Sequence, residues 1–313
     1  MTRKIIIDCD PGIDDAIALC IALFDPRVEV LAITATAGTI GASQSTTNVN
    51  AIVSQLDPPR YPRLGKASDP ENAPVVDDSH LNGSDGLGNC HLEGSDRQHL
   101  PPSEKVIAEL VRKYPNEVSL LCLGPLSNFA RLCQRDPAVL PLIDKVVISG
   151  GAVARSGNAT PVAEFNMFFD PIAAAEVFVS ATTKSLVPLD VTASIKFGVE
   201  LLSELPSKTT RVGALLHRML PFMFRTAHQQ LGRELIPLYD AVAVTAMLEP
   251  ELFTWKEMAG RVETRGEITR GATVFDRRLR PEWQTNMEVA TEVDADEVHA
   301  MIRRSLLYAG QQS

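Results

Sequence analysis

Short apolar runs alternate with segments of helical periodicity along the first 190 residues. Residues 4–10 and 28–35 are β-rich, and residues 14–24 between them carry apolar side chains at helical spacing. The same alternation predicts helices at 43–55, 103–113, after Pro125 and at 171–180, and strands at 118–123, 145–149 and 185–189. Because parallel strands require helical crossovers, this pattern predicts an α/β fold with a mostly parallel central sheet flanked by helices.

The last third of the chain has a different pattern. Helical periodicity marks residues 211–231 and 241–248 and a final helix at 294–308. Between them lie β-rich segments at 255–263, 272–276 and 286–293, so we expect a β-rich C-terminal part. Residues 58–102 are rich in Pro, Gly, Asn, Asp and Ser, which predicts a long loop over a site and not a linker. We therefore expect one domain spanning residues 1–313.

Composition narrows the class of ligand and the compartment. With 45% apolar residues in 313, the chain can bury a large core. Its net charge of -9 disfavours nucleic acids and anionic membrane surfaces as partners, so a small molecule is expected. No apolar run approaches the roughly 18 residues that span a bilayer. The five scattered cysteines contain no CxxC pair, which predicts neither a disulfide framework nor a thiolate zinc site and favours the cytoplasm.

Four aspartates lie together near the N-terminus. Asp8 and Asp10 end the first predicted strand, and Asp14 and Asp15 open the next helix. In open α/β sheets this carboxyl edge is where ligands bind. Helix capping accounts for one or two of these aspartates, not for all four. Clustered carboxylates repel one another unless a cation or shared protons compensate, so the run predicts a metal or catalytic site.

The ligand type favours a hard cation. An all-oxygen set suits calcium or magnesium better than zinc. A second hypothesis is an aspartate-based phosphatase, in which Asp-x-Asp after a first strand supplies the nucleophile and the acid. Those enzymes place Thr or Val where this chain has Gly12, and the acidic pair Asp14-Asp15 has no counterpart in them.

Two later segments add polar candidates. Asn158, Glu164 and Asn166 follow the predicted strand at 145–149 and again lie at a carboxyl edge. Two amides and a carboxylate at short spacing suit the hydroxyls of a sugar, although a turn rich in Asn and Gly is the simpler alternative. Asp240 precedes an apolar helix, where taken alone it would be an N-cap.

Several motifs in one order resemble the inosine-uridine-preferring nucleoside hydrolase family. Residues 8–16 read DCDPGIDDA and match its DxDxGxDDA signature. Residues 124–128, GPLSN, are similar to its GPLTN segment, and residues 163–166, AEFN, and 170–171, DP, repeat its next motifs. Residues 263–271, ETRGEITRG, resemble its late ETxGxxTRG stretch. Spaced motifs in a common order are more specific than any single pattern.

The resemblance implies a function and a set of site residues. It implies Ca²⁺-dependent hydrolysis of the N-glycosidic bond of a ribonucleoside by a homodimer or homotetramer. The implied calcium ligands are Asp10, Asp15, Asp240 and the main-chain carbonyl of Leu123. The implied ribose-binding residues are Asp14, Asn158, Glu164 and Asn166. Asp10 would also be the general base that takes a proton from the calcium-bound water.

This chain departs from the usual family pattern at three positions near the expected substrate. Thr39 stands where Asn is usual, and its hydroxyl can still hydrogen-bond a ribose oxygen, with shorter reach. Asn82 stands in the loop motif in place of His. Tyr239 replaces the His that protonates the leaving base in members favouring inosine and uridine, so leaving-group activation needs another explanation. His228, in a predicted lid helix at 211–231, is a candidate substitute, although a lone histidine is more often a surface residue.

These departures keep a third hypothesis open. A nucleoside-binding protein that has lost turnover would retain the metal and ribose sites and lose leaving-group chemistry. Retention of Asp10 favours the enzyme, because a binder needs no base. Purine, pyrimidine and modified bases all stay open, since the residues expected to contact the base lie in the loop and lid.

Overall fold

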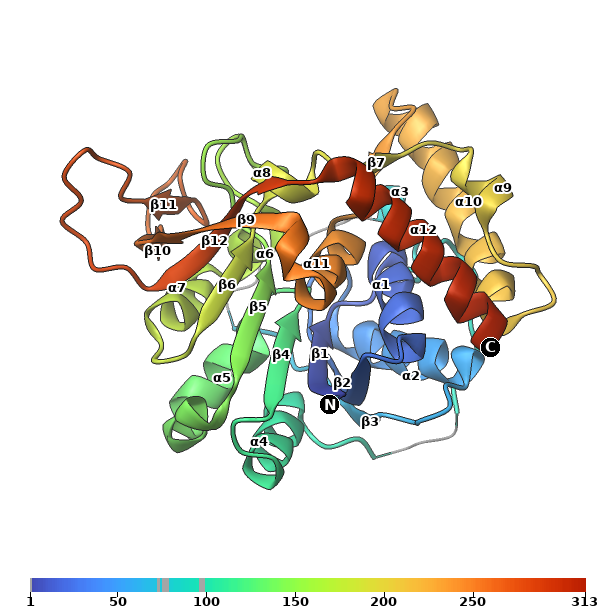
Figure 1. Cartoon of the computed structure of the whole chain (residues 1–313), viewed down its shortest axis with the longest axis horizontal. Helices are drawn as coiled ribbons and strands as arrows, with labels where there is room; N and C mark the ends of the chain where they lie inside the picture. Colours follow the sequence, from blue (N-terminus) through green and yellow to red (C-terminus); the bar gives the residue numbers. More distant parts are fainter. Residues whose placement is uncertain (1, 72–73, 75–78, 96–98) are drawn as a thin grey trace.

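An eight-stranded sheet forms the centre of the computed structural model, which describes residues 2–71, 74, 79–95 and 99–313 (Figure 1). The strands run across the sheet in the order β3-β2-β1-β4-β5-β6-β12-β9. Their bounds are β1 Arg3–Cys9, β2 Val28–Ala35, β3 Arg63–Gly65, β4 Val118–Cys122, β5 Lys145–Ser149, β6 Lys184–Val187, β9 Phe253–Met258 and β12 Met287–Val293. All neighbouring pairs are parallel except β12 with β9, which confirms the mostly parallel sheet.

The strand order reverses direction between β1 and β4. From β1 the chain builds outward through β2 and β3, and it then returns to place β4, β5 and β6 on the other side. At such a switch point the loops after adjacent strands diverge and leave a crevice at their carboxyl ends. The aspartates that follow β1 therefore lie where this architecture forms its ligand site.

Helices cover both faces of the sheet (Figure 1). One face packs against α1 Ile13–Phe24, α2 Ala42–Leu56, α10 Arg211–Leu231, α11 Tyr239–Leu248 and α12 Ala295–Gln312. The other packs against α4 Ser103–Lys113, α5 Ser127–Arg135 and α7 Pro171–Val179. β1 serves both cores by strand alternation, because Ile5 and Ile7 point to the first face and Ile6 points to the second.

Several predicted boundaries were wrong. The segment 58–102 was expected to be a loop, but it contains the edge strand β3 and the short helix α3 Ser79–Asn82. The β-rich segment at 255–263 is divided between β9 and β10 Gly260–Val262. The strand expected at 185–189 ends at Val187, and Leu189 begins α8 Leu189–Thr192.

Two small two-stranded sheets lie outside the main sheet. β10 pairs antiparallel with β11 Thr273–Phe275, and β7 Lys196–Phe197 pairs with β8 Ile236–Pro237. The remaining short helices are α6 Phe165–Phe169 and α9 Leu201–Glu204, and 3₁₀ helices lie at Pro137–Leu142 and Pro250–Leu252. Within the described ranges, no helix combines the length and apolar character needed to cross a membrane.

A buried lysine at the start of β6 gives a pH-dependent stability. Lys184 is 3% exposed, and its ammonium donates to the carbonyls of Ser180 at 2.6 Å and Thr182 at 3.0 Å. Burial lowers the pKa of Lys184 from 10.5 to about 8. Since the folded state holds this proton less tightly than the unfolded chain, the charged lysine costs stability below pH 8 and ceases to do so as the pH rises toward 10.5.

We expect the unfolding free energy of the wild type to rise between pH 8 and 10 relative to that of Lys184→Met. Urea titrations of both proteins at several pH values measure this difference, and other titrating groups cancel in the comparison. A difference that stays constant over this range would contradict the assignment.

Candidate active site

A cavity of about 670 Å³ opens at the carboxyl ends of β1, β4 and β5. Eleven of the residues singled out from the sequence line it: Asp10, Asp14, Asp15, Thr39, Asn82, Leu123, Asn158, Glu164, Asn166, Tyr239 and Asp240. They come from positions 10 to 240, and the switch point brings them to one place. The structure therefore assembles one polar site from the separate motifs.

The turn between β1 and α1 directs three of the four clustered aspartates into the cavity. Gly12 precedes α1, and its N–H donates to Asp15 Oδ2 at 2.9 Å, so one carboxylate oxygen of Asp15 does cap the helix. Asp8 was expected to join this cluster, but it does not. Its side chain lies on the α5 side of the sheet, where it accepts hydrogen bonds from Thr34 at 2.6 Å and Asn128 at 2.8 Å.

Asp10 is held by the next loop. The N–H of Thr39 donates to Asp10 Oδ2 at 2.7 Å, and the Thr39 hydroxyl also hydrogen-bonds this carboxylate. Thr39 was expected to bind a ribose oxygen, and the structure gives its hydroxyl a partner within the protein. Asn82 Oδ1 accepts the N–H of Ile13, the first residue of α1, at 3.4 Å. Both departures from the family pattern thus support the β1–α1 turn.

Asp240 reaches the cluster from a helix late in the chain. It lies in the first turn of α11 and not at the N-cap position, which Leu238 occupies. Its N–H donates to Asp14 Oδ2 at 3.1 Å, and its own Oδ1 accepts the Ser149 hydroxyl at 3.4 Å. This contact joins the N-terminal ends of α1 and α11, where both helix dipoles favour negative charge.

The wall after β5 presents the amide and carboxylate candidates. Asn166 Nδ2 donates to the carbonyls of Leu123 at 2.6 Å and Ser149 at 3.1 Å, which ties the ends of β4 and β5 together. Glu164 caps α6 and accepts the N–H groups of Met167 at 3.1 Å and Gly151 at 2.9 Å. These bonds fix both side chains before any ligand arrives.

Tyr239 stands beside Asn158. Their side chains form a hydrogen bond, and Asn158 Oδ1 also accepts the N–H of Phe165 at 2.8 Å. Burial raises the pKa of the Tyr239 hydroxyl above its usual value. A phenol with a raised pKa and an occupied hydroxyl is a weaker acid, so it is poorly suited to protonate a leaving base.

Four carboxyl groups, those of Asp10, Asp14, Asp15 and Asp240, lie close together and are here called the cavity floor. Burial raises the pKa of Asp14 to about 7 and that of Asp15 to about 6. Burial, followed by the charge of Asp15, raises the pKa values of Asp10 and Asp240 well above the usual range. Ionising all four groups together therefore requires a compensating positive charge.

The donor set fits a hard divalent cation in its chemistry. Asp14 Oδ1 and Asp15 Oδ1 are buried and hydrogen-bond to none of the residues described. In the part of the chain covered by the structure, no three His, Cys, Asp or Glu side chains are grouped so as to hold a metal ion alone. A cation would thus need further oxygens, such as the Leu123 carbonyl, a ligand or water.

The structure does not bring His228 into this cavity. Its side chain is 63% exposed, and its Nδ1 lies 3.0 Å from Oε1 of the exposed Glu234. The lid helix instead contributes Met223, Ala227 and Leu231 to the lining, and Arg233 and Ile236 follow it. Sequence reasoning missed these residues, although the apolar spacing of 211–231 and the Gly232 after it marked where the lid ends.

The β10–β11 hairpin supports the wall that carries Glu164 and Asn166. Arg270 donates to the carbonyl of Phe168 at 3.1 Å, and its guanidinium lies 5.2 Å from the centre of the Phe168 ring. Thr273 exchanges hydrogen bonds with the main chain of Ala152, at 2.8 and 2.6 Å. The late motif at 263–271 therefore does not line the cavity, and its Arg270 supports the wall by contacting the lining residue Phe168.

We expect Arg270→Gln to raise KM more than it lowers kcat, with a loss of about 10-fold in kcat/KM from misplaced binding residues. Steady-state kinetics on a cleaved ribonucleoside measure the two constants. Arg265→Gln is the matched control, because Arg265 is exposed on the same loop. Equal kinetics for the two variants would contradict the supporting role.

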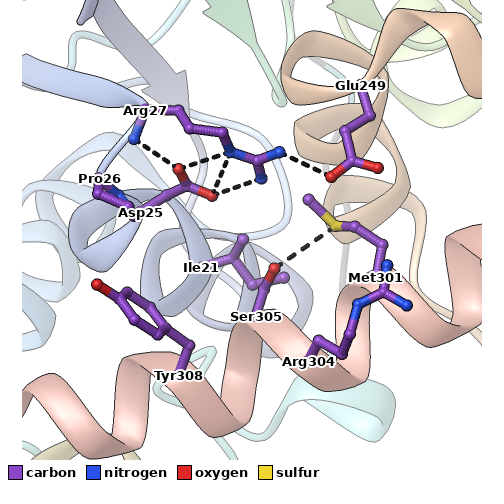
Figure 2. Close-up of a pocket in the computed structure, with 9 residues that line it drawn as sticks. All are labelled: Ile21, Asp25, Pro26, Arg27, Glu249, Met301, Arg304, Ser305 and Tyr308. Carbon is purple, nitrogen blue, oxygen red and sulfur yellow. Dashed lines mark hydrogen bonds and ion pairs between the residues drawn. The ribbon is translucent and has the colours of Figure 1, made fainter.

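A second, smaller cavity of about 270 Å³ lies near the amino end of β2 and shares no lining residue with the candidate site. Figure 2 shows the side chains that line it. Its main polar feature is an ion-pair clasp. Arg27 contacts Asp25 at 2.7 Å and Glu249 at 2.7 Å, and the clasp joins the α1–β2 loop to the end of α11. Because the charged groups of Arg27, Asp25 and Glu249 pair with one another, we infer that this cluster stabilises the fold.

Curated relatives match almost the whole chain. A probable uridine nucleosidase 1 from Oryza sativa subsp. japonica is 34% identical, covering 97% of this chain and 96% of the relative. A non-specific ribonucleoside hydrolase RihC from Salmonella enteritidis is 33% identical, covering 97% and 98% of the two chains. Both are similar over all the segments that build the cavity.

Solved structures agree with the sequence comparison. A purine-preferring ribonucleoside hydrolase from Gardnerella vaginalis superimposes with a TM-score of 0.91 at 26% identity, covering 99% of this chain and 100% of that one. A plant nucleoside hydrolase gives a TM-score of 0.88 at 28% identity, with 98% and 99% covered. Residues 5–300 match the family described as inosine-uridine preferring nucleoside hydrolase. The chain belongs to this family and is a hydrolase that acts on N-glycosyl bonds.

Proposed function

We propose that this enzyme hydrolyses the N-glycosidic bond of ribonucleosides in the cavity after β1, β4 and β5, releasing ribose and a free nucleobase. Eleven residues that the sequence marks as candidates for binding a metal or a substrate line that cavity, and this observation carries the proposal. Membership of the nucleoside hydrolase family speaks against the phosphatase hypothesis.

We assign the floor to a divalent cation, with calcium preferred. Asp10, Asp15, Asp240 and the carbonyl of Leu123 would hold it, since all offer oxygen donors and the pKa values of the three carboxylates are raised in its absence. When bound, the cation would supply fixed positive charge and Lewis acidity at this end of the cavity. Because calcium would acidify a bound water only weakly, a nearby carboxylate would be needed to remove the proton from that water.

Asp10 is the general base of the proposal. It is buried, and Thr39 fixes its Oδ2, so its position is set before substrate binds. As water attacks the anomeric carbon, Asp10 accepts the proton from that water. The glycosidic bond breaks through an oxocarbenium-like state, and the surrounding carboxylates favour the positive charge that develops on the sugar.

The ribose hydroxyls are assigned to Asp14, Asn158, Glu164 and Asn166. Asp14 offers the unpartnered Oδ1, and the other three are held by the hydrogen bonds described above. Prior positioning of these groups limits the entropy lost when the sugar binds. We further propose that the enzyme is cytoplasmic and forms a homodimer or homotetramer, which light scattering tests.

Ribose release from a panel of purine, pyrimidine and modified ribonucleosides tests the function, with calcium and then with chelator. We expect release that depends on the cation and none of phosphate from a phosphate-ester control. Calcium-dependent binding without cleavage of any nucleoside would favour the binding-protein hypothesis. Phosphate release would overturn the assignment.

A further inference from the structure

Three amide side chains of α2 hold the loop that follows α3. Each donates to a main-chain carbonyl of residues 85–95: Asn48 to Asp85 at 2.8 Å, Gln55 to Glu93 at 3.1 Å and Asn50 to Ser95 at 2.7 Å. Among the described contacts of these three amides, only Asn48 also reaches the β1–α1 turn, where its Nδ2 donates to the Pro11 carbonyl at 3.1 Å. One amide therefore joins the loop to the turn that follows Asp10.

The Asn48 side chain is buried, and its hydrogen-bonding groups are used within the protein. The residue is 2% exposed, and its Oδ1 accepts a hydrogen bond from Gln44 Nε2 at 2.8 Å. Its NH₂ group has two protons, which match the two carbonyls that it faces. Asn48 does not line the cavity, so any effect on a ligand passes through the loop and the turn that it holds.

The loop is also fixed internally. The carboxylate of Asp85 accepts three N–H groups of the loop at 2.8 Å each, those of Leu87, Asn89 and His91. The N–H of Gly88 donates to the carbonyl of Asn82 at 2.6 Å, so the segment closes on itself. The bond from Asn48 to Asp85 therefore also places Asn82 and the neighbouring Leu81, both of which line the cavity.

We propose that Asn48 is a positioning residue for the substrate: its amide sets the position of Leu81 and Asn82 relative to the β1–α1 turn, which directs the aspartates into the cavity. This inference rests on the proposed function. A second hydrogen bond between the loop and the turn, from the N–H of Ile13 to Asn82 Oδ1, is long at 3.4 Å. Asn48, with bonds of 2.8 and 3.1 Å, is the stronger link.

The general base of the proposed reaction is held by a different contact. The N–H of Thr39, in the loop after β2, donates to Asp10 Oδ2 at 2.7 Å. Loss of the Asn48 amide therefore shifts Leu81 and Asn82 more than it shifts Asp10. Because a misplaced binding wall weakens ground-state and transition-state binding together, KM should rise while kcat stays nearly constant.

Asn48→Asp removes the donor and keeps the shape of the side chain. Its carboxylate can still accept a hydrogen bond from Gln44, but it faces the Pro11 and Asp85 carbonyls without a proton to donate. We expect KM to rise at least about 10-fold and kcat to fall less than about 3-fold. Steady-state kinetics with the ribonucleoside that the wild type cleaves fastest measure both constants. Asn48→Ala, which adds no charge, should shift KM in the same direction.

Asn50→Asp is the matched control. It makes the same change on the same helix and removes a donor to the same loop, at Ser95 and not at the turn. We expect its KM and kcat to stay within about 2-fold of the wild-type values. Equal KM values for the two Asp variants, or a loss confined to kcat, would overturn the proposal.

Thermal melts separate positioning from a purely structural role. A lower melting temperature in both Asn48 variants with wild-type KM would show that Asn48 serves the fold alone, and would overturn the proposal. Should Asn48→Asp fail to fold, Asn48→Ala against Asn50→Ala makes the same kinetic comparison.

Failure of the proposed function gives a different result, in which the wild type cleaves no ribonucleoside. Hydrogen exchange then tests the attachment of the loop without turnover. We expect the amides of Leu87, Asn89 and His91 to exchange at least about 10-fold faster in Asn48→Ala than in Asn50→Ala, because the loop loses its link to the turn. Equal exchange in the two variants would overturn the role of Asn48.

Discussion

Replacing Asp10 by Asn is expected to lower kcat by about 10²- to 10⁴-fold, the range that a general base contributes. The side chain keeps its shape, and the Thr39 N–H at 2.7 Å can still donate to the amide oxygen. Burial and the charge of Asp15 raise the pKa of Asp10, so removing its charge relieves repulsion on the floor. Thermal unfolding should therefore show a melting temperature no lower than that of the wild type in the absence of divalent cations.

Asp57→Asn is the matched control for this substitution. Asp57 is exposed at the end of α2 with a φ of 43°, a conformation that Asn tolerates well, and it forms a surface ion pair with Arg211. We expect its kcat to match that of the wild type. Turnover in Asp10→Asn at the level of the control would rule out Asp10 as the base.

Gly38→Ala should abolish most activity without replacing any side chain of the site. A Cβ at Gly38 would lie 2.1 Å from Asp10 Oδ2, far inside contact distance. Gly124 closes the other side, where a Cβ would lie 2.3 Å from Asp10 Oδ1, so the carboxylate has no room to yield. We expect kcat/KM to fall at least about 100-fold as Asp10 is displaced, with a stability loss of about 1–3 kcal/mol.

The same substitution at Gly41 provides the comparison. A Cβ there meets nothing within 4 Å, and the residue lies only three positions further along the chain. Kinetics and thermal melts of the two alanine variants separate steric displacement of Asp10 from a general effect on the loop. Wild-type kcat/KM in Gly38→Ala would show that Asp10 tolerates displacement and would contradict its role.

Much of the fold was predictable because the spacing of apolar residues within each segment matches the strand or helix that the segment forms in the folded protein. The run from Arg3 to Phe24 reads as a strand and a helix, and both exist within a residue or two of the prediction. β3 was missed because three residues carry too little periodicity to separate a strand from a loop. The motifs after β1, β4 and β5 also led to cavity-lining residues, since these parallel strands end at the same edge of the sheet.

The direction of individual side chains was less predictable. Asp8 and Asp10 are both in the acidic run, yet Asp8 lies within β1 and bonds Asn128, whereas Asp10 follows the end of the strand at Cys9 and lines the cavity. His228 and Arg233 lie five positions apart, and only the end of α10 at Gly232 decides which of them lines the cavity. Such choices depend on helix ends and tertiary contacts, which a single sequence does not encode locally.

The bond between Asp14 and the main chain of Asp240 has a consequence for synthesis of the protein. It joins positions 226 residues apart, so the floor cannot close until α11 is available to pack against α1. A growing chain therefore carries its cluster of aspartates for most of translation without the second helix that completes it. We therefore expect a chain that ends before residue 240 to show no hydrolysis of ribonucleosides, because it lacks the group that completes the aspartate cluster.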